Sequence, residues 1–449
     1  MMVFVSVYGI VDGFFVSNFV GEIEFAALNL IFPFIMILGA IGFMLGTGGN
    51  AVVSKALGEG KEKKANRIFS MLVYFTVIIG VLLAVLGISF ARPVAKLFAA
   101  SEKDMSIEEK AILIENCVLY ARTIFLALPT FMLQNAFQGF FITAEKPRLG
   151  LAVTMIAGCG NILFDALFVV AFEWGLRGAA LATALNQMIG GLIPIFYFAR
   201  KNDSLLRLSK TKFQPKILAK VCYNGASELI TNVSLSVVAI VYNAQLMRFV
   251  GINGVSAYGV MQYIGFIFVA VYLGYAVGSA PIIGFHYGAQ NHSELKNIYQ
   301  KSLRILLALG VCMVVIAIVF AKILSSIFIK DDPELLLLAT QGMRFYAWSF
   351  LVVGVNIFSS SFFTALGNGT VSLILSFMRL FVLQIVCVLV LPVFFHLKGV
   401  WGSLIASEWL ALFISAYFFI RMGNTYHYRG KLPLMQESEV AKEENLQEE

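Results

Sequence analysis

Four acidic residues interrupt the long apolar stretches of this chain: Asp12, Asp165, Glu228 and Glu408. An ionisable group in a lipid-spanning helix costs roughly 2.5 to 3.5 kcal/mol on insertion scales, so such groups mark ion paths, substrate sites or buried ion pairs. A carboxylate in such a helix can bind a hard cation such as Na+ or can take up and release a proton. The chemistry of this chain is therefore expected at these acids.

Helices that cross a lipid bilayer must position the acids. Hydrophobic residues make up 59% of the chain and charged residues 13%, against about 25% charged residues in an ordinary soluble domain. A bilayer core of about 30 Å requires about 20 apolar residues per helix, because lipid offers no partner for an unpaired backbone group. The sequence predicts an all-α membrane protein with twelve transmembrane helices, near residues 2–20, 25–54, 68–90, 112–142, 149–171, 178–199, 217–247, 254–285, 298–320, 335–365, 371–391 and 400–420.

The chain also repeats itself. Phe19-Val20-Gly21 recurs as Phe249-Val250-Gly251, and at the same offset of 230 residues Gly58 falls on Gly288. Internal repeats in a very apolar chain are typical of secondary transporters, whose substrate and ion sites form where the repeats face each other.

A second pair of stretches stays in register at an offset of 221, so that Leu176-Arg177-Gly178 falls on Leu397-Lys398-Gly399. We therefore expect two pseudo-symmetric six-helix lobes, at residues 1–208 and 209–430. Residues 431–449 form a polar tail after the second lobe.

Basic residues predict the orientation, because cytoplasmic loops of membrane proteins carry the excess of Lys and Arg. With the amino terminus inside, 21 of the 33 basic residues lie in inner segments and 9 in outer ones, while Arg122, Arg344 and Arg379 lie within helices. Both termini and the tail are then cytoplasmic, and the protein is a multi-pass protein of the plasma membrane. The net charge of +7 reflects this topology, so we expect no nucleic-acid partner.

Two of the acids are predicted to lie at one depth. Asp12 is about nine residues before the outer end of its helix and Asp165 about eight before Glu173, which places both about 12 to 14 Å below the outer surface. Asn161 lies one turn before Asp165 on the same face, and Thr183 follows on the next helix. These oxygen ligands suit Na+ or a proton. The alternative is that both acids only bond Ser, Thr or Asn of adjacent helices.

Four sequence segments give the chain a specific resemblance. They are Val11-Asp12-Gly13-Phe14-Phe15-Val16, the run from Gly46 to Ser54, Asn161-Ile162-Leu163-Phe164-Asp165, and Gly178-Ala179-Ala180-Leu181-Ala182-Thr183. In this combination the chain resembles the multidrug and toxin extrusion (MATE) family of cation-coupled antiporters over essentially its whole length. The resemblance implies that Asp12, Asn161, Asp165 and Thr183 form the cation site of the amino lobe.

The chain departs from the family pattern in two places. Only eleven residues precede Asp12, fewer than is usual, so either the true start lies upstream or the first helix is short. Some members carry acids in the second lobe, and Glu228 and Glu408 are the candidates here. Glu228 is either a coupling residue or a helix-entry residue near the cytoplasmic face, and Glu408 is expected near mid-membrane, where Arg379 could pair with it for structure or for coupling.

A substrate cavity is expected where polar side chains lie among aromatic ones. Asn135 and Gln138 are three residues apart on one helical face, with Phe131 and Phe141 nearby. Aromatic faces hold lipophilic cations through cation-π contacts of about 0.5 to 2 kcal/mol. Most Phe residues are nevertheless expected to face lipid or another helix.

Enzymatic functions find no support in the sequence. It has no Walker-type glycine loop and no HExxH or GxSxG pattern, and its five cysteines and four histidines show no metal-ligand spacing. We expect no cofactor and no metal beyond Na+ at the amino-lobe site.

The predicted function is secondary active efflux of small amphiphilic or cationic compounds by a monomer in the bilayer. The two lobes alternate access, and H+ or Na+ is exchanged for the substrate. The rival hypothesis is a flippase for a lipid-linked sugar or another amphiphile, which would favour a wide cavity lined by Arg and Lys.

Overall fold

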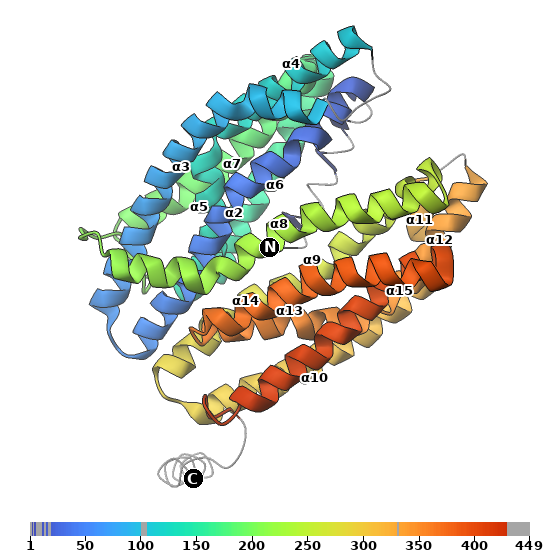
Figure 1. The fold of residues 1–449 in the computed structure, drawn as a ribbon. Helices are drawn as coiled ribbons and strands as arrows, with labels where there is room; N and C mark the ends of the chain where they lie inside the picture. Colours follow the sequence, from blue (N-terminus) through green and yellow to red (C-terminus); the bar gives the residue numbers. More distant parts are fainter. Residues whose placement is uncertain are drawn as a thin grey trace.

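Long helices that pack side by side make up the computed structural model, which describes residues 2, 4–5, 11–12, 15–16, 19–99, 106–329 and 332–428 (Figure 1). The described residues include no strand. The predicted tail at 431–449 and most of the predicted first span lie outside the described residues, although Asp12 is described and helical.

The helices of the first half precede a turn region that ends at Gln214. They are α2 (Glu22–Gly58), α3 (Glu62–Ala99), α4 (Ile107–Leu126), α5 (Leu128–Thr143), α6 (Pro147–Asp165), the π-helical η1 (Ala166–Ala171) and α7 (Gly175–Ala199).

The helices of the second half begin at Pro215. They are α8 (Pro215–Phe249), α9 (Ile252–Gly288), α10 (His292–Val319), α11 (Ala321–Ser326), α12 (Pro333–Ala347), α13 (Phe350–Ala365), α14 (Gly369–Phe377), the π-helical η2 (Met378–Val382) and α15 (Leu383–Met422). We call α2 to α7 the amino lobe and α8 to α15 the carboxy lobe.

Local sequence signals start several of these helices. The side chains of Ser106, Asn291, Asp332 and Asn368 each accept a hydrogen bond from a backbone N–H of the first turn. Such caps satisfy donors that a helix end leaves without an intrahelical partner.

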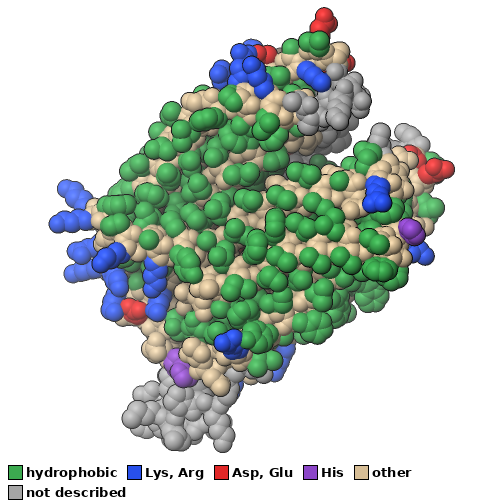
Figure 2. All heavy atoms as spheres, viewed as in Figure 1, with side chains coloured by type: hydrophobic (Ala, Val, Ile, Leu, Met, Phe, Trp, Pro, Cys, Tyr) green, Lys and Arg blue, Asp and Glu red, His purple; other side chains and the backbone are tan. Residues whose placement is uncertain are grey.

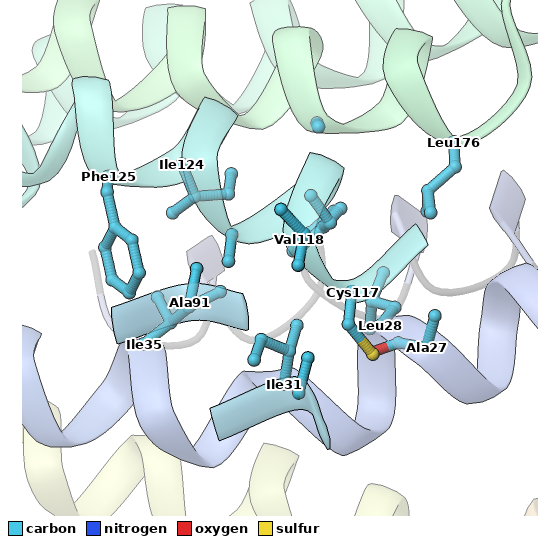
Figure 3. Packing of buried hydrophobic residues seen from close by; sticks show 14 of the residues in the cluster. Ala27, Leu28, Ile31, Ile35, Ala91, Cys117, Val118, Ile124, Phe125 and Leu176 are labelled. Atoms are coloured by element: carbon cyan, nitrogen blue, oxygen red, sulfur yellow. The ribbon is translucent and has the colours of Figure 1, made fainter. Parts of the chain in front are cut away.

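Four apolar clusters form the interior. Two belong to the amino lobe, together with a few residues from the start of α8, and two belong to the carboxy lobe. Figure 3 shows part of the first cluster, in which Ile35 of α2 and Ala91 of α3 lie beside Phe125 of α4. In the same cluster the Cys117 thiol donates to the Ala27 carbonyl oxygen at 3.4 Å. The interior therefore ties helices together mainly within each half, and the second cluster also joins the start of α8 to the amino lobe.

The helices of the structure agree with the predicted transmembrane spans from the second span onward. Within the described residues, eight helices are long and apolar enough to cross a membrane, and two bent pairs bring the number to ten. The last of the eight, Gly369–Met422, contains both the eleventh and the twelfth predicted spans, because His396 (φ 49°, ψ −132°) breaks it in the middle. The prediction of an all-helical membrane protein is thus confirmed.

The two halves break at equivalent places. α4 and α5 meet at 57°, and α12 and α13, their counterparts in the carboxy lobe, meet at 54°. A π-helical segment also follows α6 in one lobe and α14 in the other. The internal repeat of the sequence therefore extends to the irregularities of the helices.

The lobes meet at one end of the molecule, which we call the closed end. There α2 packs against α8 and α9, whereas Figure 1 shows the ribbons of the lobes diverging toward α4 and α12. A Cβ on Gly48 would overlap the Val221 carbonyl oxygen, and one on Gly225 would overlap that of Met44. The backbones of α2 and α8 thus touch where each presents a glycine.

A second pair of glycines joins α2 to α9. A Cβ on Gly58 would overlap the Phe285 carbonyl oxygen, and one on Gly288 would overlap that of Lys55. The Lys55 ammonium also lies 4.5 Å from the centre of the Tyr287 ring. Gly58 and Gly288 are equivalent positions of the repeat, so the repeat supplies both sides of this contact.

Charge is distributed unevenly over the surface. Figure 2 shows a broad apolar belt with Lys and Arg gathered at the closed end. There Lys61, Lys63, Lys64 and Arg67 line a shallow depression at the start of α3. An apolar belt with charged ends is the surface that a bilayer requires of a spanning protein.

Replacing Gly48 with Ala should open the closed end. The added methyl group meets the backbone of α8, and overpacking of this kind costs about 1 to 3 kcal/mol. Spin labels attached to cysteines that replace the exposed Lys63 and Lys301 should report a longer distance between the lobes in double electron–electron resonance. Gly402→Ala is the matched control, because nothing among the described residues lies within 4 Å of a Cβ at that position. Equal distance distributions for the two variants would contradict the assigned contact.

Candidate functional site

The amino lobe gathers the polar residues that the sequence singled out. The Thr183 hydroxyl of α7 donates to Asp12 Oδ1 at 3.3 Å. The side chains of Asp165 and Asn161, both on α6, lie beside the Asp12 carboxyl group. All four predicted residues therefore come together, although three separate helical segments supply them.

The members of this cluster differ in exposure. Asp165 is fully buried and Asn161 is 1% exposed, whereas Asp12 is partly exposed. Among the described residues, neither Asp165 oxygen nor the Asn161 side-chain nitrogen has a well-formed hydrogen bond, and the polar group beside both is the Asp12 carboxyl group. Buried polar atoms normally have partners, so this cluster has spare capacity to bind a ligand.

Tyr120 of α4 is a further member that the sequence did not reveal. It is 3% exposed, its hydroxyl lies beside Thr183, and it is close to both acids. In a sequence, a Tyr within an apolar run resembles a packing aromatic. The available signal is that a Tyr hydroxyl in a membrane span needs a polar partner.

The donor set favours a hard cation or a proton. Two carboxylates, an amide and two hydroxyls supply oxygen atoms, which suit ions such as Na+ and not softer transition metals. The described residues include no group of three or more His, Cys, Asp or Glu side chains that could hold a metal ion. Two neighbouring acids can also share a proton, because a single proton removes the repulsion between them.

The carboxy lobe holds a buried ion pair. Arg379 Nε donates to both carboxylate oxygens of Glu408, each at 2.9 Å, and the Asn356 side chain donates to Glu408 Oε2 at 2.9 Å. Ser415 in turn donates to Asn356 Oδ1 at 3.0 Å. The pairing that the sequence suggested for Arg379 and Glu408 is present, and Asn356 and Ser415 extend it into a network.

Both groups of ionisable residues lie at π-helical segments. Asp165 is the last residue of α6, directly before η1, and Arg379 lies inside η2. A π-helical turn shifts the side chains that follow it and is frequent at functional sites. The same irregularity thus occurs beside an acid in one lobe and beside a base in the other.

A cavity of about 100 Å³ lies between the lobes. Asn135 and Gln138 of α5 line it from the amino lobe, and Glu228 and Arg379 line it from the carboxy lobe. A second cavity of about 180 Å³ shares Arg379 with the first and reaches Glu408. Phe141, expected near the substrate, instead packs in the aromatic cluster with Phe137 and Phe198 and is 2% exposed.

The position of Glu228 corrects one of its two sequence interpretations. The helix-entry alternative is wrong, because α8 begins at Pro215 and Glu228 lies well inside it, roughly 20 Å along the axis. Its side chain faces the cavity between the lobes. Glu228 has no ion-pair partner among the described residues.

Comparison with known proteins gives a consistent result over most of the chain. The MatE family model matches residues 1–167 and 229–390. The multidrug export protein MepA of Staphylococcus haemolyticus (strain JCSC1435) is 24% identical over 421 residues, which covers 93% of this chain and 90% of that protein. MepA of Staphylococcus aureus (strain MSSA476) is 22% identical, with 90% and 88% covered.

Solved structures share the fold. A crystal structure of MATE in the straight conformation aligns with a TM-score of 0.87 at 20% identity, covering 96% of this chain and 95% of the other. An outward-facing multidrug resistance MATE transporter of the MOP superfamily aligns with a TM-score of 0.86, at the same identity and coverage.

Breaking the ion pair of the carboxy lobe should destabilise the protein. Arg379→Gln leaves the Glu408 carboxylate, 4% exposed, without its cation, and loss of one partner of a buried pair costs about 3 to 5 kcal/mol. Arg379→Gln combined with Glu408→Gln removes both charges and should recover most of this loss. Thermal unfolding of the purified variants in one detergent measures the effect. A double variant no more stable than the single one would contradict the pairing.

Proposed function

The chain belongs to the MatE family, and on this basis we propose that it is a secondary active multidrug exporter. It moves amphiphilic, mainly cationic compounds out of the cell in exchange for H+ or Na+. The observation that carries the proposal is a largely apolar cavity with a few polar and ionisable side chains where the two repeats meet, together with an acid cluster in the amino lobe. The multidrug export proteins that resemble the chain along most of its length support it.

The acid cluster is the proposed coupling site. Asp12 is the entry point for the ion because it remains partly exposed, while the buried Asp165 and Asn161 complete the site. Thr183 and Tyr120 hold the cluster in place from α7 and α4. Binding of the ion cancels one negative charge of the acid pair, which lets the helices around it repack and lowers the affinity for the substrate.

The closed end is proposed to be cytoplasmic. Its basic loops favour that side, and this places both termini inside the cell, with residues 1–208 and 209–430 as the moving lobes. The described conformation is then outward-facing, with the inner gate shut by the glycine contacts of α2 with α8 and α9. Opening of that gate exposes the cavity to the cytoplasm or the inner leaflet.

The flippase alternative has less support from the cavity lining. A site for a lipid-linked sugar is expected to carry several Arg and Lys side chains that bind its phosphates. The cavity between the lobes and the cavity inside the carboxy lobe are lined by a single arginine, Arg379, and by no lysine. Arg379 is also partly neutralised by Glu408.

Transport driven by an ion gradient should require both acids of the amino lobe. Inverted membrane vesicles are supplied with ethidium and given an outwardly directed H+ or Na+ gradient, and uptake is followed by fluorescence. Asp12→Asn and Asp165→Asn should each reduce gradient-driven uptake to the level of vesicles without the protein, because neither variant can exchange the ion.

Asp203→Asn, in the exposed turn region between the lobes, is the matched control and should transport normally. The gradient that drives uptake identifies the coupling ion. Absence of ethidium uptake with either gradient, in well-folded wild-type protein, would refute the exporter and favour the flippase.

A further inference from the structure

Arg379 lies at the junction of the two cavities. Its side chain is 14% exposed, and it lines both the cavity between the lobes and the cavity inside the carboxy lobe. Thr231 of α8 also lines both cavities, one helical turn after Glu228. A bound molecule of moderate size could therefore contact Arg379 and Glu228 at the same time.

The ion pair with Glu408 uses only part of the Arg379 guanidinium group. Both carboxylate oxygens of Glu408 are bonded to Nε, and the two terminal nitrogens have no hydrogen-bond acceptor among the described residues. These nitrogens form a planar fork of N–H donors that matches a carboxylate or another oxyanion. Glu408 and Asn356 meanwhile fix the orientation of the side chain.

Glu228 supplies the opposite charge in the same cavity. It has no cationic partner among the described residues, and its backbone carbonyl oxygen accepts a hydrogen bond from the Asn232 side chain. A carboxylate in a largely apolar cavity attracts a cationic group, because the low dielectric strengthens the attraction. The cavity therefore presents an acid and a base at separate points of one wall.

We propose that this cavity selects amphiphiles that carry both a cationic and an oxyanionic group. The cationic group binds Glu228, and the carboxylate or similar oxyanion binds the terminal nitrogens of Arg379. The inference rests on the proposed export function and extends it by naming a zwitterionic substrate class and the residue that recognises the anionic part. Glu408 acts as a positioning residue, because it holds Arg379 without touching the substrate.

Two dyes that differ in one methyl ester test the proposal. Rhodamine 110 carries a free carboxylate beside its cationic ring system, whereas rhodamine 123 is its methyl ester and carries only the cation. Fluorescence anisotropy with the purified full-length protein in lipid nanodiscs gives a dissociation constant for each dye.

The decisive variant is Arg379→Gln combined with Glu408→Gln, which removes the arginine without leaving a lone carboxylate. Its affinity for rhodamine 110 should fall roughly tenfold or more, as expected for loss of a charge-assisted hydrogen bond, while its affinity for rhodamine 123 changes little. Glu408→Gln alone retains Arg379 but loosens its orientation, so it should weaken binding of rhodamine 110 less than the double variant does. Glu228→Gln should weaken binding of both dyes.

Arg344→Gln is the matched control, because this arginine is exposed on α12 and lines neither cavity. Equal losses for the two dyes in the double variant, or no loss for either, would overturn the zwitterion site. Ethidium transport by the wild type separates the two proposals. If ethidium is transported but the double variant loses equal affinity for both dyes, the selectivity inference fails and the exporter proposal stands. Absence of ethidium transport rejects the exporter proposal itself.

Discussion

A charged side chain inside a lipid-spanning helix must find its partner within the protein, and this constraint organises the whole structure. Lipid cannot solvate such a group, so each one draws other helices toward it. In the carboxy lobe Glu408 is satisfied by Arg379 and Asn356. In the amino lobe Asp165 lies beside a second acid and retains unused oxygen atoms. One lobe thus neutralises its buried charge internally, while in the proposed mechanism the other binds an ion from outside.

The contact between the two lobes includes close approaches of one backbone to another. Lipid tails are as apolar as Leu or Val, so contact between membrane helices depends on close packing and hydrogen bonds. At the closed end that packing is backbone against backbone, at Gly48 with Val221 and at Gly58 with Phe285. Such contacts stabilise the closed arrangement. Each half meanwhile keeps its own apolar interior.

The sequence predicted much of the site because acids stand out in an apolar chain. Depth and helical spacing were enough to bring Asp12 and Asp165 together and to pair Arg379 with Glu408. Tyr120 was not predicted as a site residue, because a Tyr within an apolar run resembles an aromatic residue that only packs. The break between α4 and α5 has a local signal in Pro129. The kink at His396 follows Pro392 and lies in the gap that the sequence predicted between the last two spans. The break before Phe350 and the π-helical segments η1 and η2 have no such signal. These features depend on packing between distant segments, which spacing along the chain does not encode.

The unequal charges of the two lobes bear on how voltage acts on the protein. Moving one elementary charge through 100 mV is worth about 2.3 kcal/mol. The pair formed by Arg379 and Glu408 carries no net charge, so the electric field exerts little net force on it. In the proposed mechanism the acids of the amino lobe change their net charge when the coupling ion binds or leaves. The membrane potential would then act on the transport cycle mainly through one of two lobes built on the same repeat.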